Sequence, residues 1–291
     1  MSQAVREGGL QPQDKRLMGM LRGIGRAAVV ALYDELALAP KPGLVSFIDS
    51  GSHDDMDART LMRSLFSLRL YFPRLAGLGA AGSTFEVLER EGIAAEARML
   101  AATGGINTHR GAVFSLGLLC ASAGALVAQG ARLDTAALRR ELITRWGRAL
   151  SERVLRSGLA HGAIAARRFG LRSAGAEAML GFPVLFETTL PALLAAQQSG
   201  AAPREARLQA LFETMAVLED TNLAHRGGLA GLRHAQREAR AFLAAGGALR
   251  PDALAHASAV HADFVSRRLS PGGTADMLAA ACWAQRVCGQ A

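Results

Sequence analysis

Residues 111–131 carry no charged side chain, which is the strongest constraint that this sequence places on its fold. A run of this length is long enough to cross a membrane as a helix. It is rich in Ala, Gly and Ser, and it follows directly on a polar, glycine-marked segment, Gly104–Gly111. Apolar helices at the centre of large domains have the same character. We therefore expect a buried central helix here and treat a membrane span as the lesser alternative.

The composition favours helices along the rest of the chain. Half of its 291 residues are hydrophobic but only 5% are aromatic, so alanine and leucine supply most apolar side chains. Both favour helix, whereas runs of Val, Ile and Thr that would indicate strands are scarce. No low-complexity linker divides the chain. We expect an all-α fold, with residues 15–291 in a single large domain and residues 1–14 as a flexible tail.

Apolar spacing and capping residues predict roughly ten helices. A helix from about 17 to 38 must stop before the two prolines that flank Lys41, since proline cannot continue it. Ser83 and Glu86 match a capping box, and Asp134 is a candidate N-cap. Other predicted helices start near 57 and 134 or span about 184–197, 204–219, 229–244, 252–268 and 274–288. Several follow polar, glycine-rich segments, so a site built from loops at helix N-termini is expected.

The charge and cysteine content limit the classes of partner. The net charge of +8 is almost wholly arginine, because Lys15 and Lys41 are the only lysines. The arginines form no stripe interleaved with aromatics, so a basic helical nucleic-acid-binding module is only a remote alternative. A phosphorylated small substrate fits the charge equally well. Three cysteines form no metal or disulfide pattern, and the N-terminus has no apolar signal segment, so a cytoplasmic protein is expected.

Two polar segments are candidates for binding phosphate. Lys41, stiffened by its prolines, either presents a compact charge to a phosphate or faces solvent in a turn. In the segment Gly104–Gly111, glycines allow close backbone approach, and the N–H groups that open the next helix favour anions. His109 and Arg110 would add charge-assisted donors there, each worth roughly 1.5–3 kcal/mol to a well-placed phosphate.

The segment Ser50–Asp57 places three aspartates within four positions at the start of a predicted helix. The helix dipole favours acidic side chains at this place, and capping accounts for one of them. Asp54 and Asp57 lie three residues apart and would share one face of the first turn. Such a pair suits Mg²⁺, which takes one or two carboxylates together with substrate phosphates. Alternatively, one of the two is a general base.

Two further segments combine polar side chains with glycine. Residues 220–228 bring a carboxylate, an amide, an imidazole and a guanidinium between two predicted helices. Residues 270–276 form a glycine turn at a helix start, where capping by Ser270 or Asp276 is a sufficient explanation for either residue alone.

Taken in order, these segments resemble the triphosphoribosyl-dephospho-CoA synthase family over roughly residues 25 to 285. The resemblance rests on the segments Pro40–Val45, Ser50–Asp57, Ala101–Gly111, Asp220–Asn222 and Ser270–Asp276, with support from Gly92–Leu100 and Gly181–Pro183. Each motif alone is weak, whereas five in the same order are specific. Arg110 departs from the family, whose members often have Lys there, and residues 173–177 fit less well.

The resemblance implies an all-α fold and one reaction. ATP and 3′-dephospho-CoA would give 2′-(5″-triphosphoribosyl)-3′-dephospho-CoA and adenine. This product is the precursor of the prosthetic group of the acyl-carrier subunit of malonate decarboxylase or citrate lyase, and a holo-acyl-carrier-protein synthase would receive it. Mg²⁺ is expected with ATP. Neither nucleic acid nor membrane is expected as a partner, and the oligomeric state is left open, a homodimer included.

On this hypothesis the site residues fall into two groups. The carboxylates and the imidazole for catalysis or Mg²⁺ are Asp54, Asp57, Asp220 and His109, with Asp54 and Asp57 as the metal ligands. The residues that would bind phosphate or other parts of the substrates are Lys41, Ser50, His53, Asn107, Thr108, Arg110, Asn222, Arg226, Gly272 and Gly273. A metal-dependent all-α phosphohydrolase or glycohydrolase acting on a nucleotide would use the same residues and is the main alternative.

Overall fold

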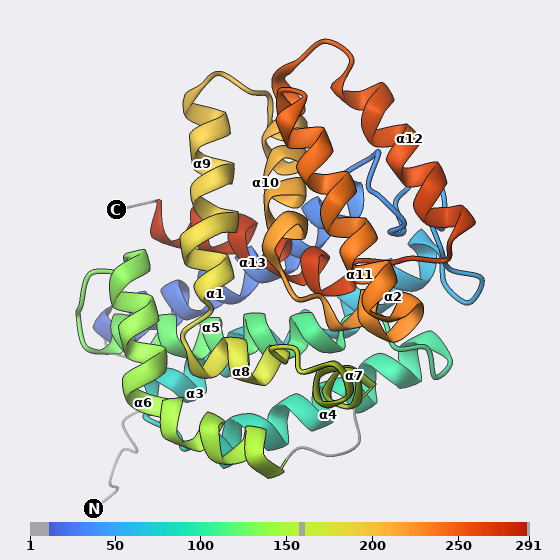
Figure 1. The fold of residues 1–291 in the computed structure, drawn as a ribbon. Coiled ribbons are helices and arrows are strands. Elements are labelled where there is room, and N and C mark those ends of the chain that lie inside the picture. The colour runs from blue at the N-terminus through green and yellow to red at the C-terminus, as the bar shows by residue number, and fades with distance from the viewer. Residues whose placement is uncertain (1–11, 157–160, 290–291) are drawn as a thin grey trace, which may run out of the picture.

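The computed structural model describes residues 12–156 and 161–289. Within these ranges the chain forms thirteen α-helices and no strand, which confirms the all-α prediction (Figure 1). The helices are α1 Pro12–Ala37, α2 Ala58–Ser67, α3 Tyr71–Ala80, α4 Phe85–Thr103, α5 Arg110–Ala128, α6 Thr135–Arg156, α7 His161–Phe169, α8 Ala174–Met179, α9 Leu190–Gln198, α10 Pro203–Val217, α11 Thr221–Ala244, α12 Ala253–Ser266 and α13 Gly272–Cys288. A π-helical turn, Leu185–Thr189, precedes α9, and a short 3₁₀ turn, Gly247–Leu249, precedes α12.

The expected buried central helix is confirmed as α5. It contacts α1, α3, α4, α6, α8 and α13, and runs through the middle of the molecule in Figure 1. It is long and apolar enough to cross a membrane, but 78% of its most apolar window is buried inside the protein. Its lack of charge is therefore explained by helix packing.

Small residues let α3 and α5 approach closely. A Cβ on Gly79 of α3 would lie 1.9 Å from the carbonyl oxygen of Ala121, and a Cβ on Gly124 of α5 would lie 1.9 Å from that of Ala76. The two glycines thus serve the same contact from opposite sides, and neither backbone could approach the other if a side chain intervened. The Ala, Gly and Ser content of residues 111–131 reflects this close packing.

Several predicted boundaries are confirmed and others are wrong. The helix α1 ends at Ala37, ahead of the prolines, and Asp134 caps α6 by accepting a hydrogen bond from the backbone N–H of Ala137 at 2.8 Å. The Ser83–Glu86 capping box is wrong, because Thr84 is the N-cap residue of α4 and makes no side-chain capping bond. Residues 12–14 belong to α1 rather than to a tail, and residues 1–11 lie outside the described residues.

The sequence also missed short helices. Pro73 is the third residue of α3 and lies in its first turn, where its missing N–H is not needed. The short helices α7 and α8 were not predicted at all. In α11, Gly228 has φ 62° and ψ −166°, so the helix is kinked where a separate helix from about 229 was expected.

Candidate active site

Asp220 joins the N-termini of two helices. It is buried and is the N-cap of α11, where its Oδ1 accepts hydrogen bonds from the backbone N–H groups of Asn222 at 2.9 Å and Leu223 at 3.4 Å. Its Oδ2 accepts from the backbone N–H and the hydroxyl of Thr274, in the first turn of α13, at 2.8 and 3.0 Å. Both oxygens accept hydrogen bonds from the two helix starts, so Asp220 positions α11 and α13 relative to each other. Its expected role as a general base or metal ligand stays a prediction.

A third helix N-terminus reaches the same point through Asp276. The carboxyl group of Asp276, on α13, accepts a hydrogen bond from the backbone N–H of Ala112 in the first turn of α5. It lies so close to Gly111 that a Cβ there would be 1.9 Å from Oδ2. The N-termini of α5, α11 and α13 thus converge. Each helix start carries a partial positive charge, and the carboxyl groups of Asp220 and Asp276 accept hydrogen bonds from the N–H groups there.

Asp276 is not a cap, contrary to the expectation from its place near a helix start. The residue before α13 is Pro271, and the side chain that accepts from an N–H in the first turn of α13 is that of Asp220. Burial raises the pKa of the Asp276 carboxyl well above its usual range, and the charges of Asp220 and Glu35 raise it further. This setting favours the protonated form of the carboxyl group.

Lys41 lies beneath this point and is 2% exposed, so the alternative of a solvent-facing lysine is wrong. Its Nζ donates to the carboxylate of Glu35 at 2.5 Å and to the backbone oxygen of Glu35 at 2.7 Å. Burial lowers the pKa of Lys41, and Glu35 opposes this change. Since the pair is buried and close, the positive charge of Lys41 is matched by Glu35 in this structure.

A chain of hydrogen bonds sets the tautomer of His109, which is 4% exposed. The hydroxyl of Thr108 donates to Oγ of Ser64 at 2.7 Å, and Oγ of Ser64 lies 2.7 Å from Nδ1 of His109. With Ser64 donating to Nδ1, the ring proton is assigned to Nε2, a buried atom with no hydrogen-bond partner among the described residues. Burial, and then the charge of Lys41, lower the pKa of His109 to about 4. The imidazole is neutral near pH 7, so the expected charged donor is instead a neutral N–H.

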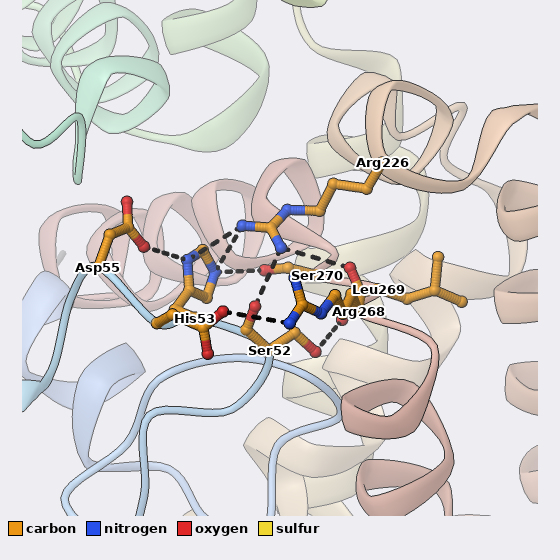
Figure 2. Close-up of polar contacts among 8 residues, drawn as sticks. Ser52, His53, Asp55, Arg226, Arg268, Leu269 and Ser270 are labelled. Atoms are coloured by element: carbon orange, nitrogen blue, oxygen red, sulfur yellow. Dashed lines mark hydrogen bonds and ion pairs between the residues drawn. The ribbon is translucent and has the colours of Figure 1, made fainter.

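A second polar group lies nearer the surface, on the loop before α2 (Figure 2). Nε2 of His53 lies 2.9 Å from Oγ of Ser270, and Nδ1 lies 3.1 Å from the guanidinium of Arg226. The same guanidinium donates to the backbone oxygens of Ser52 at 3.0 Å and Arg268 at 3.3 Å. Arg226 thus ties the loop to α11 and to the segment before α13. Burial, and then the charge of Arg226, lower the pKa of His53.

The pairing of Asp54 and Asp57 on one helix face is wrong. Because α2 begins at Ala58, Asp57 is its N-cap residue and accepts from the backbone N–H and the hydroxyl of Thr60 at 2.8 and 2.7 Å. Asp54 lies in the preceding loop, with its side chain 88% exposed and 3.5 Å from Arg268. In the part of the chain that the structure describes, no three His, Cys, Asp or Glu side chains are grouped so that they could hold a metal ion.

The remaining predicted residues surround these groups. Arg110 is half exposed and pairs with Glu96 at 3.0 Å, and Asn107 is exposed beside it. Asn222 is exposed and lies against Gly272, while Gly273 lies against the carboxylate of Asp220. Ser50 accepts a backbone hydrogen bond from His53 at 3.2 Å.

A cavity of about 170 Å³ opens beside the converging helices. Asp220, Thr221, Gly273 and Asp276 form one side of it, and Gly111 adds the start of α5. Since one water molecule needs only about 10–15 Å³ of such space, this cavity has room for an organic group. It places a ligand directly against the residues described above.

Comparison with known proteins identifies the group to which the chain belongs. Residues 21–290 match the family model described as ATP:dephospho-CoA triphosphoribosyl transferase. The chain belongs to this family. A relative from Acinetobacter calcoaceticus is 39% identical over 251 residues, which cover 86% of each chain. Another from Stutzerimonas stutzeri is 40% identical over 268 residues, 89% of this chain and 90% of the relative. Both are described as "probable 2-(5''-triphosphoribosyl)-3'-dephosphocoenzyme-A synthase", and no solved structure matches the chain.

Membership of the triphosphoribosyl transferase family confirms the resemblance drawn from the five motifs and makes the chain an enzyme of the transferase class. Some of these motifs are also neighbours in space. Oγ of Ser52, in the segment Ser50–Asp57, donates to the backbone oxygen of Leu269, the residue before the segment Ser270–Asp276, at 2.6 Å. Oγ of Ser64, on α2, is hydrogen-bonded to Thr108 and His109 in the segment Ala101–Gly111.

Sequence reasoning missed two contributors to this transferase site. Asp276 was noticed only as a possible cap, since its carboxyl faces α5 through a contact that chain order does not show. The other is the wall of the cavity formed by Arg172, Glu177 and Phe182. The motifs themselves contained a signal for both contributors. Asp276 is the last residue of the segment Ser270–Asp276, and Phe182 is the middle residue of Gly181–Pro183.

Proposed function

We propose that this enzyme transfers the triphosphoribosyl group of ATP to the 2′-hydroxyl of 3′-dephospho-CoA where α5, α11 and α13 converge. The observation that carries the proposal is the meeting of three helix N-termini on Asp220 and Asp276, next to a cavity. A triphosphate is the most highly charged group in either substrate. The partial positive charges of these helix starts favour a triphosphate near them, outside the cavity, although the N–H groups that donate to Asp220 and Asp276 are already in use.

Around this point, the chain offers further donors to phosphate oxygens. The Nε2–H of His109 has no protein partner, so a phosphate oxygen that reached it would satisfy a buried polar group. Arg110 and Asn107 lie on the exposed side of the same segment. Lys41 and Arg226 act less directly, since their donors are turned to Glu35 and to backbone oxygens of the site loops. We assign them to positioning the loops and to the positive potential of the site.

Transfer at the anomeric carbon passes through an oxocarbenium-like state, as in other glycosyl transfers. The bond to adenine weakens before the bond to the acceptor oxygen is complete, so the site must stabilise positive charge on the ribose. The triphosphate stays intact throughout, and the site needs no group that attacks phosphorus. The absence of a Walker A sequence in the chain agrees with this requirement.

Mg²⁺ is proposed as the partner of the triphosphate. When bound, it would neutralise phosphate charge and hold the chain of phosphates in one conformation. The donor set for a two-carboxylate site at Asp54 and Asp57 does not fit, because Asp57 caps α2. Asp54, which is exposed on the loop before α2, fits as a single carboxylate ligand beside phosphate oxygens and water.

We further propose a cytoplasmic enzyme whose product passes to a holo-acyl-carrier-protein synthase. Malonate decarboxylase is the proposed recipient, with citrate lyase as the alternative. To distinguish them, the product is incubated with such a synthase and with the apo-carrier subunit of either malonate decarboxylase or citrate lyase. The carrier whose mass increases by that of the prosthetic group is the recipient.

The reaction itself is tested by incubating the enzyme with ATP, dephospho-CoA and Mg²⁺ and analysing the mixture by mass spectrometry. Stoichiometric adenine and a triphosphoribosyl adduct of dephospho-CoA are expected, with no inorganic phosphate. Phosphate or diphosphate release would instead support the metal-dependent hydrolase. Adenine without an adduct would support a glycohydrolase.

The metal is tested separately. Removing divalent ions with EDTA should abolish adduct formation, and added Mg²⁺ should restore it. Asp54→Asn should raise the Mg²⁺ concentration needed for half-maximal rate. Asp57→Asn retains a capping residue and should leave that concentration unchanged. Equal Mg²⁺ requirements in the wild type and both variants would remove Asp54 from the metal site.

A further inference from the structure

The cavity beside the converging helices has apolar walls and one polar side. Its apolar walls consist of Phe114, Phe182, Val184, Val217, Leu218 and Met277. The polar side is formed by the carboxyl groups of Asp220 and Asp276 with the first residues of α11 and α13. Pockets of this kind bind flat, largely apolar ligands and orient them with a few polar groups. Of the parts of the two substrates, a nucleobase fits this description, and a phosphate does not.

One wall of the cavity is held in a conformation that the chain does not adopt freely. Phe182 has φ 52°, in the left-handed region that a bulky side chain normally avoids. Glu177 holds the backbone on both sides of this residue. Its carboxylate accepts a hydrogen bond from the backbone N–H of Val184 at 2.7 Å, and its backbone oxygen accepts one from the backbone N–H of Phe182 at 2.8 Å. Arg172 pairs with the same carboxylate at 3.1 Å. An ion pair between the buried Glu177 and the exposed Arg172 thus shapes the wall, and backbone strain of this kind is commonly found at ligand sites.

The two aspartates that face the cavity differ in what their oxygens can still do. Asp220 accepts hydrogen bonds from Asn222, Leu223 and Thr274, which occupy both of its oxygens. Asp276 accepts only from the backbone N–H of Ala112 among the contacts that the structure gives it. It therefore retains an oxygen that can exchange a proton with a ligand in the cavity.

We propose that the cavity holds the adenine ring of ATP and that Asp276 is the general acid that protonates this ring as it leaves. This inference rests on the proposed function, because adenine is the group that triphosphoribosyl transfer from ATP must release. Adenine is a poor leaving group as an anion, whereas protonation of a ring nitrogen lets it depart neutral. General acids at such positions contribute about 10²–10⁴-fold to the rate.

In the proposed step, one bond to C1′ of the ATP ribose breaks and another forms. The bond between C1′ of the ATP ribose and N9 of adenine breaks, and its electron pair goes to the adenine ring. The proton of the Asp276 carboxyl group passes to a ring nitrogen, which leaves the carboxylate. The 2′-hydroxyl oxygen of dephospho-CoA bonds to C1′ and loses its proton, and this proton, carried by solvent, restores the Asp276 carboxyl group.

The charges around Asp276 make it suited to this role. Burial, and then the negative charges of Asp220 and Glu35, raise its pKa, which favours the protonated form that a general acid needs. Lys41 pairs with Glu35, and the charged residues Arg172, Glu177 and Glu219 also line the cavity. A group that must be protonated loses activity as pH rises through its pKa. The wild-type kcat should therefore fall on the alkaline side, and Asp276→Asn should lack that fall.

The decisive experiment compares ATP with N7-methyl-ATP, whose adenine ring already carries a positive charge and leaves without taking up a proton. Asp276→Asn should lower kcat with ATP by about 10²–10⁴-fold. With N7-methyl-ATP the variant should react within about tenfold of the wild type. Asp252→Asn, an exposed aspartate before α12, is the matched control and should equal the wild type with both substrates.

Two results would overturn the proposal. One is an equal loss of kcat with ATP and N7-methyl-ATP, which would show that Asp276 acts through structure or through the metal. The other comes from the wild-type enzyme, which remains testable if the variant does not fold. If the proton goes to N7 or N3, the nitrogens of the adenine ring nearest the breaking bond, the rate with 7-deaza-ATP or with 3-deaza-ATP should fall. Unchanged rates with both would exclude protonation at these two nitrogens and overturn the proposal. If wild-type enzyme released no adenine from ATP, the proposed function itself would fail first.

Discussion

Asp220 and Thr274 lie 54 residues apart and are joined twice, since the backbone N–H and the hydroxyl of Thr274 both donate to Oδ2 of Asp220. The other oxygen of Asp220 caps α11. One buried carboxylate therefore aligns the starts of α11 and α13, and this alignment forms the polar side of the cavity. The site depends on this carboxylate as a structural element.

Asp220→Asn should destabilise the protein. An amide has one acceptor oxygen where the carboxylate has two, and its NH₂ group would face N–H donors of a helix start. Each lost N-cap costs about 0.5–2 kcal/mol, so we expect a loss of about 2–4 kcal/mol in the free energy of unfolding. Urea unfolding followed by circular dichroism measures it. Asp252→Asn, at the start of α12 where no side chain caps the helix, should change it by less than about 0.5 kcal/mol.

Gly111→Ala should disrupt the contact between α5 and Asp276. A Cβ at this position would lie 1.9 Å from Oδ2 of Asp276, so the carboxyl group must move away from the N-terminus of α5. We expect a loss of stability of about 1–3 kcal/mol, typical of overpacking, and a larger fall in kcat than in substrate affinity. Gly19→Ala is the control: nothing lies within 4 Å of its Cβ, and alanine in an exposed helix should add up to about 1 kcal/mol. Wild-type kcat in Gly111→Ala would show that the position of Asp276 does not matter.

His109 should make stability fall in acid. Its pKa in the folded protein is about 4, below the value of 6.5 expected in the unfolded chain. The unfolded chain therefore binds the proton more readily, so the contribution of neutral His109 is complete above pH 6.5 and is lost as pH falls from there towards 4. The contribution is on the order of 3 kcal/mol, since one pKa unit corresponds to about 1.36 kcal/mol.

The comparison of wild type with His109→Gln isolates this effect, because glutamine does not titrate. Over the same pH range the raised pKa of Asp276 acts in the opposite direction in both proteins and cancels in the difference. The difference in unfolding free energy between wild type and variant should shrink steadily from pH 6.5 to pH 4. A difference that stayed constant would mean that His109 is not a buried neutral imidazole.

Arg226→Gln should raise the pKa of His53. The charge of Arg226 is the second cause of the lowered value after burial, so its removal leaves the burial effect and the opposing effect of Asp55. The shift is measured by NMR titration of the His53 ring protons. Arg233→Gln, one residue before His234 and outside this cluster, should leave the His53 titration unchanged. A lower pKa in Arg226→Gln would contradict the contact drawn in Figure 2.

The sequence alone predicted the helical class, the central helix and the segments that form the site. These features depend on local patterns: the uncharged run of residues 111–131, the abundance of alanine and leucine, and the glycine-marked motifs. The capping of α6 by Asp134 was predictable for the same reason, because a capping side chain and the N–H that donates to it lie within one turn. The motifs, read in order, also led to the family that the comparisons confirm.

Tertiary structure alone decided what each polar residue does. Asp57, predicted to bind metal, caps α2, and Asp220, predicted as base or ligand, holds two helix starts together. The positive charge of Lys41 is balanced by the carboxylate of Glu35, and the imidazole of His109 is neutral near pH 7 because it is buried. The pKa of an ionisable group depends on its burial and on its distance from charges that lie far away in the sequence. Neither can be read from local sequence spacing. The chain order therefore supplies the residues of the site, and the packing of α5, α11 and α13 assigns their charges and their roles.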